Sequence, residues 1–355
     1  MKIVAVRSYL KKMALTKPYT IAYNTFSDVS IAFFEVELAN GLIGYGAGSP
    51  AEEVVGETAE QTAVNLQTNF VQQFVGKDIR HFQQIIFETI QHFSHLPGTQ
   101  AAIDIALHDA FGKWIGISVA EFYGRKIKAL PTSVTIGIKS VEEALEEAAG
   151  YKALGFKIVK VKTGLNVAED IERVLKIKEQ FGNHFKIRVD ANQGYCLADL
   201  KQFIAATKGK DLELIEQPMP VGTENELLNL SWEDRKLLAA DESLKNPTAA
   251  LQMASSEKPF GIFNIKLMKC GGLVGALGIA NIAQNANIDL FWGCNDESII
   301  SITAALHVAY ACPNTKYIDL DGSLDLAEDL VNGGFEIVNG EMHIQQTPGF
   351  GFNLL

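Results

Sequence analysis

Residues 157–163 read KIVKVKT and residues 186–192 read KIRVDAN, and these two stretches decide the expected fold. Each is an apolar run of strand length, and residues two apart in a strand share a face. The valines of the first stretch suit a face that helices cover, so Lys160 and Lys162 should point to the opposite, inner face. The same alternation places Asp190 of the second stretch on the inner face. The two strands therefore share one register.

Further apolar stretches of this kind, each followed by a helical pattern, lie on both sides of this pair. They occupy residues 131–138, 212–218, 237–243, 261–269, 289–295 and 316–322. Eight strands at intervals of about 24 to 29 residues are what a parallel barrel with an outer ring of helices requires. An open doubly wound sheet is the alternative, but no G-x-G-x-x-G follows an early strand. We therefore predict an α/β fold, a (β/α)8-type barrel over residues 126–322.

The N-terminal third has a different pattern. Strand-like alternation fills most of the first 50 residues, and apolar residues then recur at helical spacing over 54–93 and 100–115. This order predicts an α+β capping domain over residues 1–125. Residues 323–355 return to short mixed segments and should pack back onto that domain.

The composition excludes several classes of protein. The chain has 355 residues, of which 47% are hydrophobic and 21% charged, as in ordinary globular proteins. A net charge of -11 disfavours nucleic acid and anionic membrane surfaces as partners. No apolar run reaches the roughly 18 residues of a membrane helix, and the start lacks a signal-peptide pattern, so we expect a cytoplasmic protein. The four cysteines form no CxxC pair, so neither a zinc knuckle nor a disulfide framework is indicated.

Three carboxylates fall on the inner face when the register is carried forward, namely Asp190, Glu216 and Asp241. All lie late in their strands, at the end where barrel enzymes carry their catalytic groups. For any one of them an ion pair with an interior cation such as Arg188 is an alternative. Three together need a counter-ion, and Mg²⁺ prefers oxygen ligands. The sequence therefore predicts a Mg²⁺ site, which Asn192 should support from behind.

Two lysines flank this triad from the second and sixth strands, so they should approach from opposite sides of a closed barrel. A desolvated lysine near other cations favours its amine form, so Lys162 and Lys266 could exchange a proton with substrate. A metal on a substrate carboxylate stabilises the ene-diolate that loss of the α-proton creates, and return of a proton from the other face inverts the carbon. Lys160 could act as a fixed positive charge. Its alternative is an ion pair with Glu216 or Asp190 and no chemical task.

The motifs around these residues form a recognisable set. They are KVK at 160–162, VDAN at 189–192, IEQP at 215–218, ADES at 240–243 and NIKLMKCGG at 264–272. The set resembles the muconate-lactonizing subgroup of the enolase superfamily, in particular its dipeptide epimerases, over nearly the whole chain. The resemblance implies a capping domain on a barrel, Mg²⁺ on the three carboxylates, and the two lysines as an acid/base pair.

Smaller features narrow the substrate. The run DLDG at the end of the eighth strand resembles the motif with which dipeptide epimerases bind the substrate's α-ammonium group, which assigns that role to Asp319 and Asp321. An acidic barrel rim is the alternative. Thr135, Asn295 and Asp296 follow strand ends and are candidate pocket residues. No histidine falls at a strand end, which disfavours a site like that of mandelate racemase.

Residues 19–26 correspond to the loop that covers the substrate in this family. Epimerases of Ala-Glu tend to carry an arginine there, whereas this chain has Asn24 and no basic residue in the loop. Tyr19 and Phe26 offer apolar area instead. We therefore expect a preference for dipeptides with small or hydrophobic side chains.

Together these features predict a Mg²⁺-dependent dipeptide epimerase, an isomerase of amino acid derivatives that forms a homo-oligomer. A muconate cycloisomerase or an o-succinylbenzoate synthase would share the metal and lysine site and is the first alternative. A non-catalytic metal-binding barrel is the second.

Overall fold

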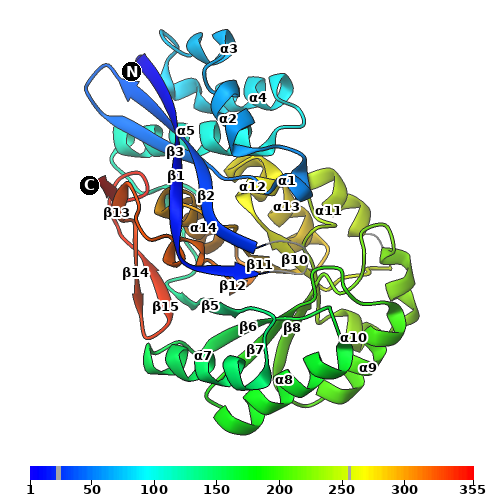
Figure 1. Ribbon diagram of the computed structural model, residues 1–355. Helices are drawn as coiled ribbons and strands as arrows, with labels where there is room; N and C mark the ends of the chain where they lie inside the picture. The colour runs from blue at the N-terminus through cyan, green and yellow to red at the C-terminus, as the bar shows by residue number, and fades with distance from the viewer. Residues whose placement is uncertain (21–24, 255–256) are drawn as a thin grey trace.

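A computed structural model describes residues 1–20, 25–254 and 257–355, without the side chains of residues 17–26. Eight parallel strands form one sheet in sequence order (Figure 1). They are β5 (Ser133–Ile136), β6 (Ile158–Lys162), β7 (Lys186–Asp190), β8 (Leu212–Glu216), β9 (Leu238–Ala240), β10 (Ile262–Ile265), β11 (Asp289–Trp292) and β12 (Thr315–Ile318). A parallel bridge between Thr132 and Ile318 joins the two edges of the sheet. The predicted barrel is confirmed, and each of its strands overlaps a stretch that the sequence indicated.

Helices cover the outside of the barrel. They are α7 (Val141–Ala153), α8 (Val167–Phe181), α9 (Leu197–Thr207), α10 (Trp232–Arg235), α11 (Pro247–Met253), α12 (Leu267–Cys270), α13 (Leu273–Asn285) and α14 (Ile299–Ala311). A 3-10 helix, η2 (Glu224–Asn229), precedes α10. The last strand, β12, is followed by the short 3-10 helix η3 (Gly322–Leu324) instead of an α-helix. The chain then leaves the barrel, so the eighth unit departs from an ideal (β/α)8 pattern.

The barrel interior is layered from apolar to charged along the strands. Leu214, Ala239, Ile262 and Phe291 form an apolar cluster in the lower half of the barrel. Two residues after three of these positions come Glu216, Asp241 and Asn264, because alternate residues of a strand return to the same face. The apolar layer therefore supports a polar layer at the C-terminal ends of the strands.

The N-terminal part contains an antiparallel sheet and a group of helices. The sheet has the order β1 (Ile3–Thr20), β2 (Thr25–Leu38) and β3 (Ile43–Gly48). The helices are α1 (Glu52–Val55), α2 (Ala59–Asn65), α3 (Asn69–Gln72), η1 (Ile79–His81), α4 (Phe82–His92), α5 (Pro97–Ile115) and α6 (Val119–Phe122). In the described residues no helix has the length and apolarity of a membrane span.

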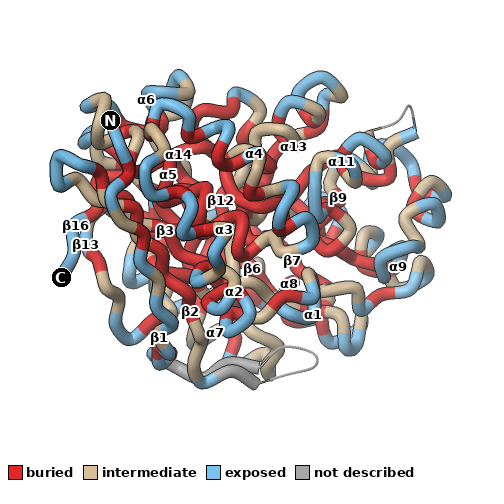
Figure 2. The backbone as a smooth tube through the Cα atoms, turned by 90° about the horizontal axis from the view of Figure 1, so that it is seen from above, coloured by how far each residue is buried: buried red, intermediate tan, exposed pale blue. Residues whose placement is uncertain are grey.

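Close packing of β3 on α5 explains a repeated glycine in the sequence. Gly44, Gly46 and Gly48 alternate along β3 and face small residues of α5. A Cβ on Gly46 would collide with the carbonyl oxygen of Ala102, so only glycine allows this approach. The helix is buried along most of its length (Figure 2), which fixes the N-terminal sheet against the barrel side of the molecule.

The C-terminal segment contributes four short strands, β13 (Val331–Gly333), β14 (Phe335–Val338), β15 (Glu341–Ile344) and β16 (Phe352–Leu354). β15 pairs with β4 (Leu130–Pro131), directly before the barrel. The same segment reaches the N-terminal sheet, where Thr16 N donates to Asp325 O at 2.7 Å and Ala327 N to Ala14 O at 2.9 Å. The segments that precede and follow the barrel in the sequence therefore meet above its mouth.

Candidate active site

Two lysines face each other across the barrel mouth. Lys162 ends β6 and Lys266 follows β10, four strands apart in a closed sheet of eight. Lys162 Nζ lies 2.7 Å from Asp190 Oδ2, and Lys266 Nζ lies 3.0 Å from Asp241 Oδ2. The two amines thus contact different carboxylates of one cluster.

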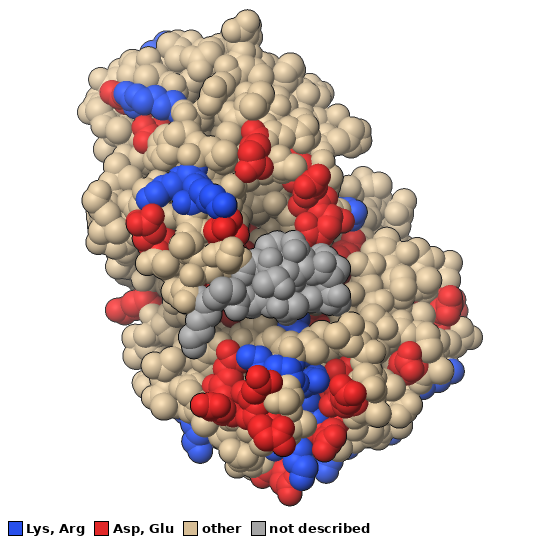
Figure 3. All heavy atoms as spheres, viewed as in Figure 1, with Lys and Arg blue, Asp and Glu red and all other residues tan. Residues whose placement is uncertain are grey.

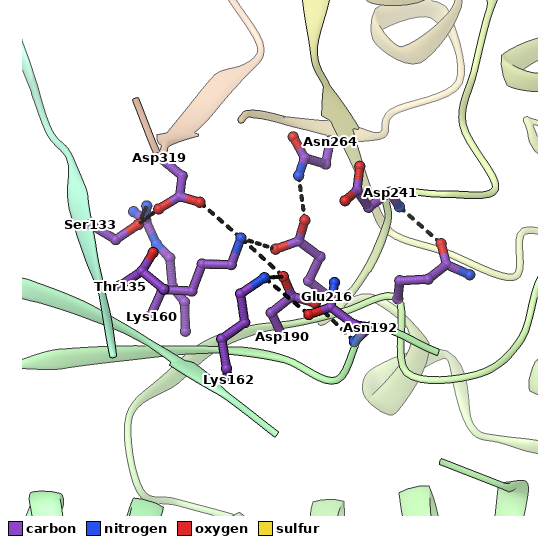
Figure 4. Close-up of polar contacts among 12 residues, drawn as sticks. Ser133, Thr135, Lys160, Lys162, Asp190, Asn192, Glu216, Asp241, Asn264 and Asp319 are labelled. Carbon is purple, nitrogen blue, oxygen red and sulfur yellow. Dashed lines mark hydrogen bonds and ion pairs between the residues drawn. The ribbon is translucent and has the colours of Figure 1, made fainter. Parts of the chain in front are cut away.

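The three carboxylates of the expected metal site lie close together and are almost fully buried (Figure 4). Among the residues that the structure describes, no three acidic, histidine or cysteine side chains already surround a common centre. Instead the amine of Lys160 lies 3.1 Å from Asp190 and 2.7 Å from Glu216 Oε2. Apart from this ion pair, Glu216 Oε2 accepts no hydrogen bond from the described residues. A buried set of carboxylate oxygens with spare acceptor capacity fits a hard divalent cation.

Burial and mutual repulsion separate the acidities of these carboxyl groups. Burial, and then the charge of Asp190, raises the pKa of Glu216 to about 8. Burial would also raise the pKa of Asp190, but the charges of Lys162 and Lys160 lower it to about 2. The pKa of Asp241 is held well below its usual value, since Lys266 and Lys269 outweigh its burial. Ionisation of all three buried carboxyl groups is therefore unfavourable unless positive charges lie next to them.

Lys266 differs from expectation in one respect. Burial lowers the pKa of its amine, as predicted, but the charges of Asp241 and Glu216 reverse this effect and raise the pKa above its usual value. The facing carboxylates therefore favour the protonated form of the amine. The expectation of a lowered pKa beside a bound cation stays a prediction.

The amine of Lys160 forms the ion pairs with Asp190 and Glu216 that the alternative to a catalytic role required, and it also pairs with Asp319, at 2.9 Å. The three acids raise the pKa of Lys160 well above its usual value despite complete burial. Lys160 is therefore a fixed cation in the centre of the mouth, which the proposed electrostatic role also needs.

Arg188 does not pair with the three carboxylates. Its guanidinium lies lower in the barrel, over the rings of Phe291 and Tyr317, and its Nε donates to Glu213 at 2.9 Å. The suggested alternative, in which Arg188 neutralises the carboxylates, is therefore excluded.

The two aspartates of the DLDG run have different surroundings. Asp319 accepts hydrogen bonds from Ser133 Oγ at 2.5 Å and Lys160 Nζ at 2.9 Å (Figure 4). The side chain of Asp321 accepts a hydrogen bond from the backbone N–H of Thr135 at 3.1 Å. Burial and the charges of Asp319 and Asp325 raise the pKa of Asp321 well above its usual value. Asp319 therefore belongs to the lysine cluster, whereas Asp321 pairs with no cation among the described residues.

More acidic groups lie next to Asp321. Burial, followed by the charges of Asp296, Asp319 and Glu147, raises the pKa of Asp325 to about 7. Within the described ranges, neither Asp321 nor Asp325 forms an ion pair. Figure 3 shows acidic side chains together with lysine and arginine side chains on this face, so the acidic character of the region rests on Asp321, Asp325 and their neighbours. This part of the mouth is thus an acidic region.

The remaining predicted residues have varied positions. Asn192 accepts a hydrogen bond from Lys162 at 3.0 Å, and its own N–H donates to Asp190 Oδ1, as a supporting role requires. Asn295 donates to Ser49 O, and Asp296 O accepts from Ser49 Oγ, so both join the barrel to the end of β3. Thr135 contacts Asp321 through its backbone.

The loop that we assigned to substrate binding is described only in part. Asn24 lies outside the described residues, and so do the side chains of Tyr19 and Phe26. Their expected contacts with substrate stay predictions.

Ser133 and Asp325 were not among the predicted site residues, and neither were three residues around the carboxylates of the expected metal site. Asn264 Nδ2 donates to Glu216 Oε1 at 2.5 Å, and Gln217 Oε1 accepts from the N–H groups of Asp241 and Ser243. Lys269 Nζ donates to Asp241. Asn264 could have been found, because it precedes Lys266 by two residues and shares its face. Nothing in the alternation of strands points to Lys269, which lies on a helix.

Comparison with known proteins agrees with this geometry. The Enolase C-terminal domain-like model matches residues 143–355, and the Mandelate racemase / muconate lactonizing enzyme N-terminal domain model matches residues 3–124. An L-Lys-D/L-Arg epimerase of Desulforapulum autotrophicum is 48% identical over 351 residues, 99% of each chain. A hydrophobic dipeptide epimerase of Enterococcus faecalis is 33% identical over 340 residues, 95% of each chain.

A solved structure is similar over the same length. The dipeptide epimerase from Methylococcus capsulatus, complexed with Mg and the dipeptide L-Arg-D-Lys, has a TM-score of 0.97 at 43% identity and covers 99% of each chain. The expectation of an isomerase acting on amino acid derivatives is confirmed by these relatives. The chain belongs to the mandelate racemase/muconate lactonizing enzyme family of the enolase superfamily.

Proposed function

We propose that the chain is a Mg²⁺-dependent dipeptide epimerase that inverts an α-carbon by two-base proton transfer. The observation that carries this proposal is the placement of Lys162 and Lys266 on opposite sides of one carboxylate cluster. One amine on each side of a substrate α-carbon is what removal from one face and return to the other requires. The solved relative that binds Mg and a dipeptide supports the same reaction.

Each residue of the cluster has its own part in this reaction. Asp190, Glu216 and Asp241 would hold Mg²⁺, which supplies positive charge for the ene-diolate formed when the α-proton leaves. The lysine on one face takes the proton and the lysine on the other face donates one. Asn192 orients Lys162 through its side-chain oxygen. Lys160, held by three acids, stays protonated and stabilises negative charge on the substrate.

The acidic region suggests the kind of dipeptide. An α-ammonium group would supply a cation for Asp321, and a basic side chain would suit Asp325 and its acidic neighbours. The more similar relatives are L-Lys-D/L-Arg epimerases, at 48% and 43% identity, against 33% for the hydrophobic dipeptide epimerase. We therefore propose dipeptides that contain lysine or arginine. This choice differs from the small or hydrophobic side chains expected from residues 19–26, whose side chains lie outside the described part of the chain.

Deuterium exchange tests the proposal. The enzyme is incubated in D₂O with Mg²⁺ and a set of dipeptides that includes L-Lys-L-Arg, L-Ala-L-Lys, L-Ala-L-Leu and L-Ala-L-Glu. Mass spectrometry should detect one deuterium at one α-carbon, together with the epimer, fastest for the basic dipeptides. The Lys162→Ala/Lys266→Ala double variant is the control for exchange at this site. Absence of exchange in every dipeptide would exclude the proposed reaction, and faster exchange in L-Ala-L-Leu would exclude only the basic preference.

A further inference from the structure

Lys269 is a buried lysine of the site that the proposed proton transfer does not use. It lies on α12, three residues after Lys266, and its side chain is 4% exposed. Its amine donates to the Asp241 carboxylate, to the Asp241 carbonyl oxygen at 2.6 Å and to the Asn264 carbonyl oxygen at 3.1 Å. All three donor positions of the ammonium group are therefore filled by protein.

Each oxygen of the Asp241 carboxylate pairs with a different lysine. Oδ1 contacts Lys269, whereas Oδ2 lies 3.0 Å from Lys266. The Lys266 side chain is 15% exposed, almost four times as much as that of Lys269. Lys266 can therefore meet a substrate, but Lys269 holds Asp241 from the closed side.

The contacts of Lys269 extend to a second carboxylate. Asn264, whose carbonyl accepts from Lys269, donates its side-chain amide to Glu216 Oε1 at 2.5 Å. Neighbouring strands β8, β9 and β10 carry Glu216, Asp241 and Asn264 respectively or end just before them. Lys269 thus joins the strand ends that present two of the three carboxylates.

We propose that Lys269 is a positioning residue that fixes Asp241, and through Asn264 the neighbouring Glu216, for Mg²⁺ binding. This inference rests on the proposed function, because it needs the ion at these carboxylates. Removal of the amine leaves a buried Asp241 carboxylate oxygen without its donor and takes one donor from the carbonyl oxygens of Asp241 and Asn264. The Asp241 carbonyl oxygen keeps its bond from Leu244 N at 2.9 Å, but the Asp241 side chain should lose its fixed geometry. Loss of groups that orient metal ligands typically weakens metal binding about 10- to 100-fold.

The test is Lys269→Met, which keeps the length of the side chain and removes its charge. Calorimetric titration of Mg²⁺ into the enzyme without substrate should give a dissociation constant about 10 to 100 times higher than in the parent. Lys113→Met is the matched control, since Lys113 pairs with Asp109 at 2.7 Å within α5, away from the site. It should lower the melting temperature without changing Mg²⁺ affinity. Lys269→Gln serves as the second variant.

The outcomes separate the two proposals. A folded Lys269 variant with unchanged or tighter Mg²⁺ binding overturns the inference, because loss of a nearby positive charge would then matter more than loss of positioning. If neither Lys269 variant folds while Lys113→Met does, Lys269 is needed for the barrel and the inference also fails. If the parent binds no Mg²⁺, or Asp190→Asn leaves its binding unchanged, the proposed function itself fails.

Discussion

The carboxylates on the two sides of the barrel mouth differ in their ion-pair partners. On the side of β6 to β10, Asp190, Glu216 and Asp241 each contact at least one lysine amine. On the side of β12 and the segment after it, Asp321 and Asp325 have no ion pair with any described residue. The boundary between the two sides runs through Asp319, which contacts Lys160.

This difference teaches which charges the protein provides and which it leaves to a ligand. Buried charges are costly unless they are paired, and the lysine side provides its own pairs. The acidic side instead raises the pKa of Asp321 and Asp325, so a cationic group is needed to stabilise their ionised forms. We infer that the lysine side is preformed for the reaction, whereas the acidic side is completed by substrate.

The largest effect should come from removing one lysine of the facing pair. Lys266→Ala should lower kcat for epimerisation by about 10²- to 10⁴-fold, since each direction of inversion needs both amines. Deuterium exchange, measured by NMR in D₂O, should persist for the epimer whose α-proton faces Lys162. In Lys162→Ala, deuterium exchange should persist for the other epimer, whose α-proton faces Lys266. Loss of exchange for both epimers in both variants would contradict the division of faces.

Asp321→Asn tests the acidic side, of whose two aspartates Asp321 is the more buried. Loss of one charge opposite the α-ammonium group should raise KM about 10- to 100-fold with a smaller change in kcat, because a hydrogen bond to a charged group contributes about 1.5–3 kcal/mol. Steady-state kinetics on L-Ala-L-Lys measures both constants. An N-acetylated dipeptide, which lacks the ammonium group, is the matched control. Its KM and kcat should differ little between the parent and the variant. A fall in kcat alone would place Asp321 with the lysine side.

Ser133→Ala tests the boundary. Ser133 donates to Asp319 Oδ1, while Lys160 occupies Oδ2, so the loss should loosen Asp319 and Lys160 without removing a charge. The bond is to an ionised carboxylate that keeps Lys160 as a partner, so we expect the lower end of the range for hydrogen bonds to charged groups, about 1.5 kcal/mol, and a fall in kcat/KM of about 10-fold. The fall should be found mainly in kcat, and the melting temperature should be compared in parallel. A change confined to KM would show that Asp319 acts on the ammonium group after all.

The smallest effect concerns pH and Asp325. Its pKa of about 7 is raised, so the carboxylate ionises only as the pH rises through neutrality. The preference for L-Ala-L-Lys over L-Ala-L-Leu, as a ratio of kcat/KM, should therefore increase from about pH 6 to about pH 8. For a partly exposed charge pair the change should be about 2- to 5-fold. Asp325→Asn should flatten this dependence, and an equally steep profile in the variant would rule Asp325 out as its cause.

Much of the fold could be predicted from the alternation of strand residues, as two strands illustrate. In β6 and β7 the valines lie against the helices and Lys160, Lys162 and Asp190 lie inside, as predicted. The absence of an α-helix directly after β12 was not foreseen, because the DLDG run carries no signal for the element that comes next. The raised pKa of Lys266 was not foreseen either, since it depends on distances to Asp241 and Glu216 that strand alternation does not supply.

The sequence by itself determined the direction of each side chain and the family, because alternation within a strand and short motifs are local properties of the chain. The tertiary structure alone decided the partners. Closure of the sheet brings Asp319 to Ser133, 186 residues away, and leaves Arg188 lower in the barrel with Glu213. It also sets Lys269, on a helix, behind Asp241. Ion pairing depends on separations of a few ångströms across the barrel, and these exist only once the strands have closed.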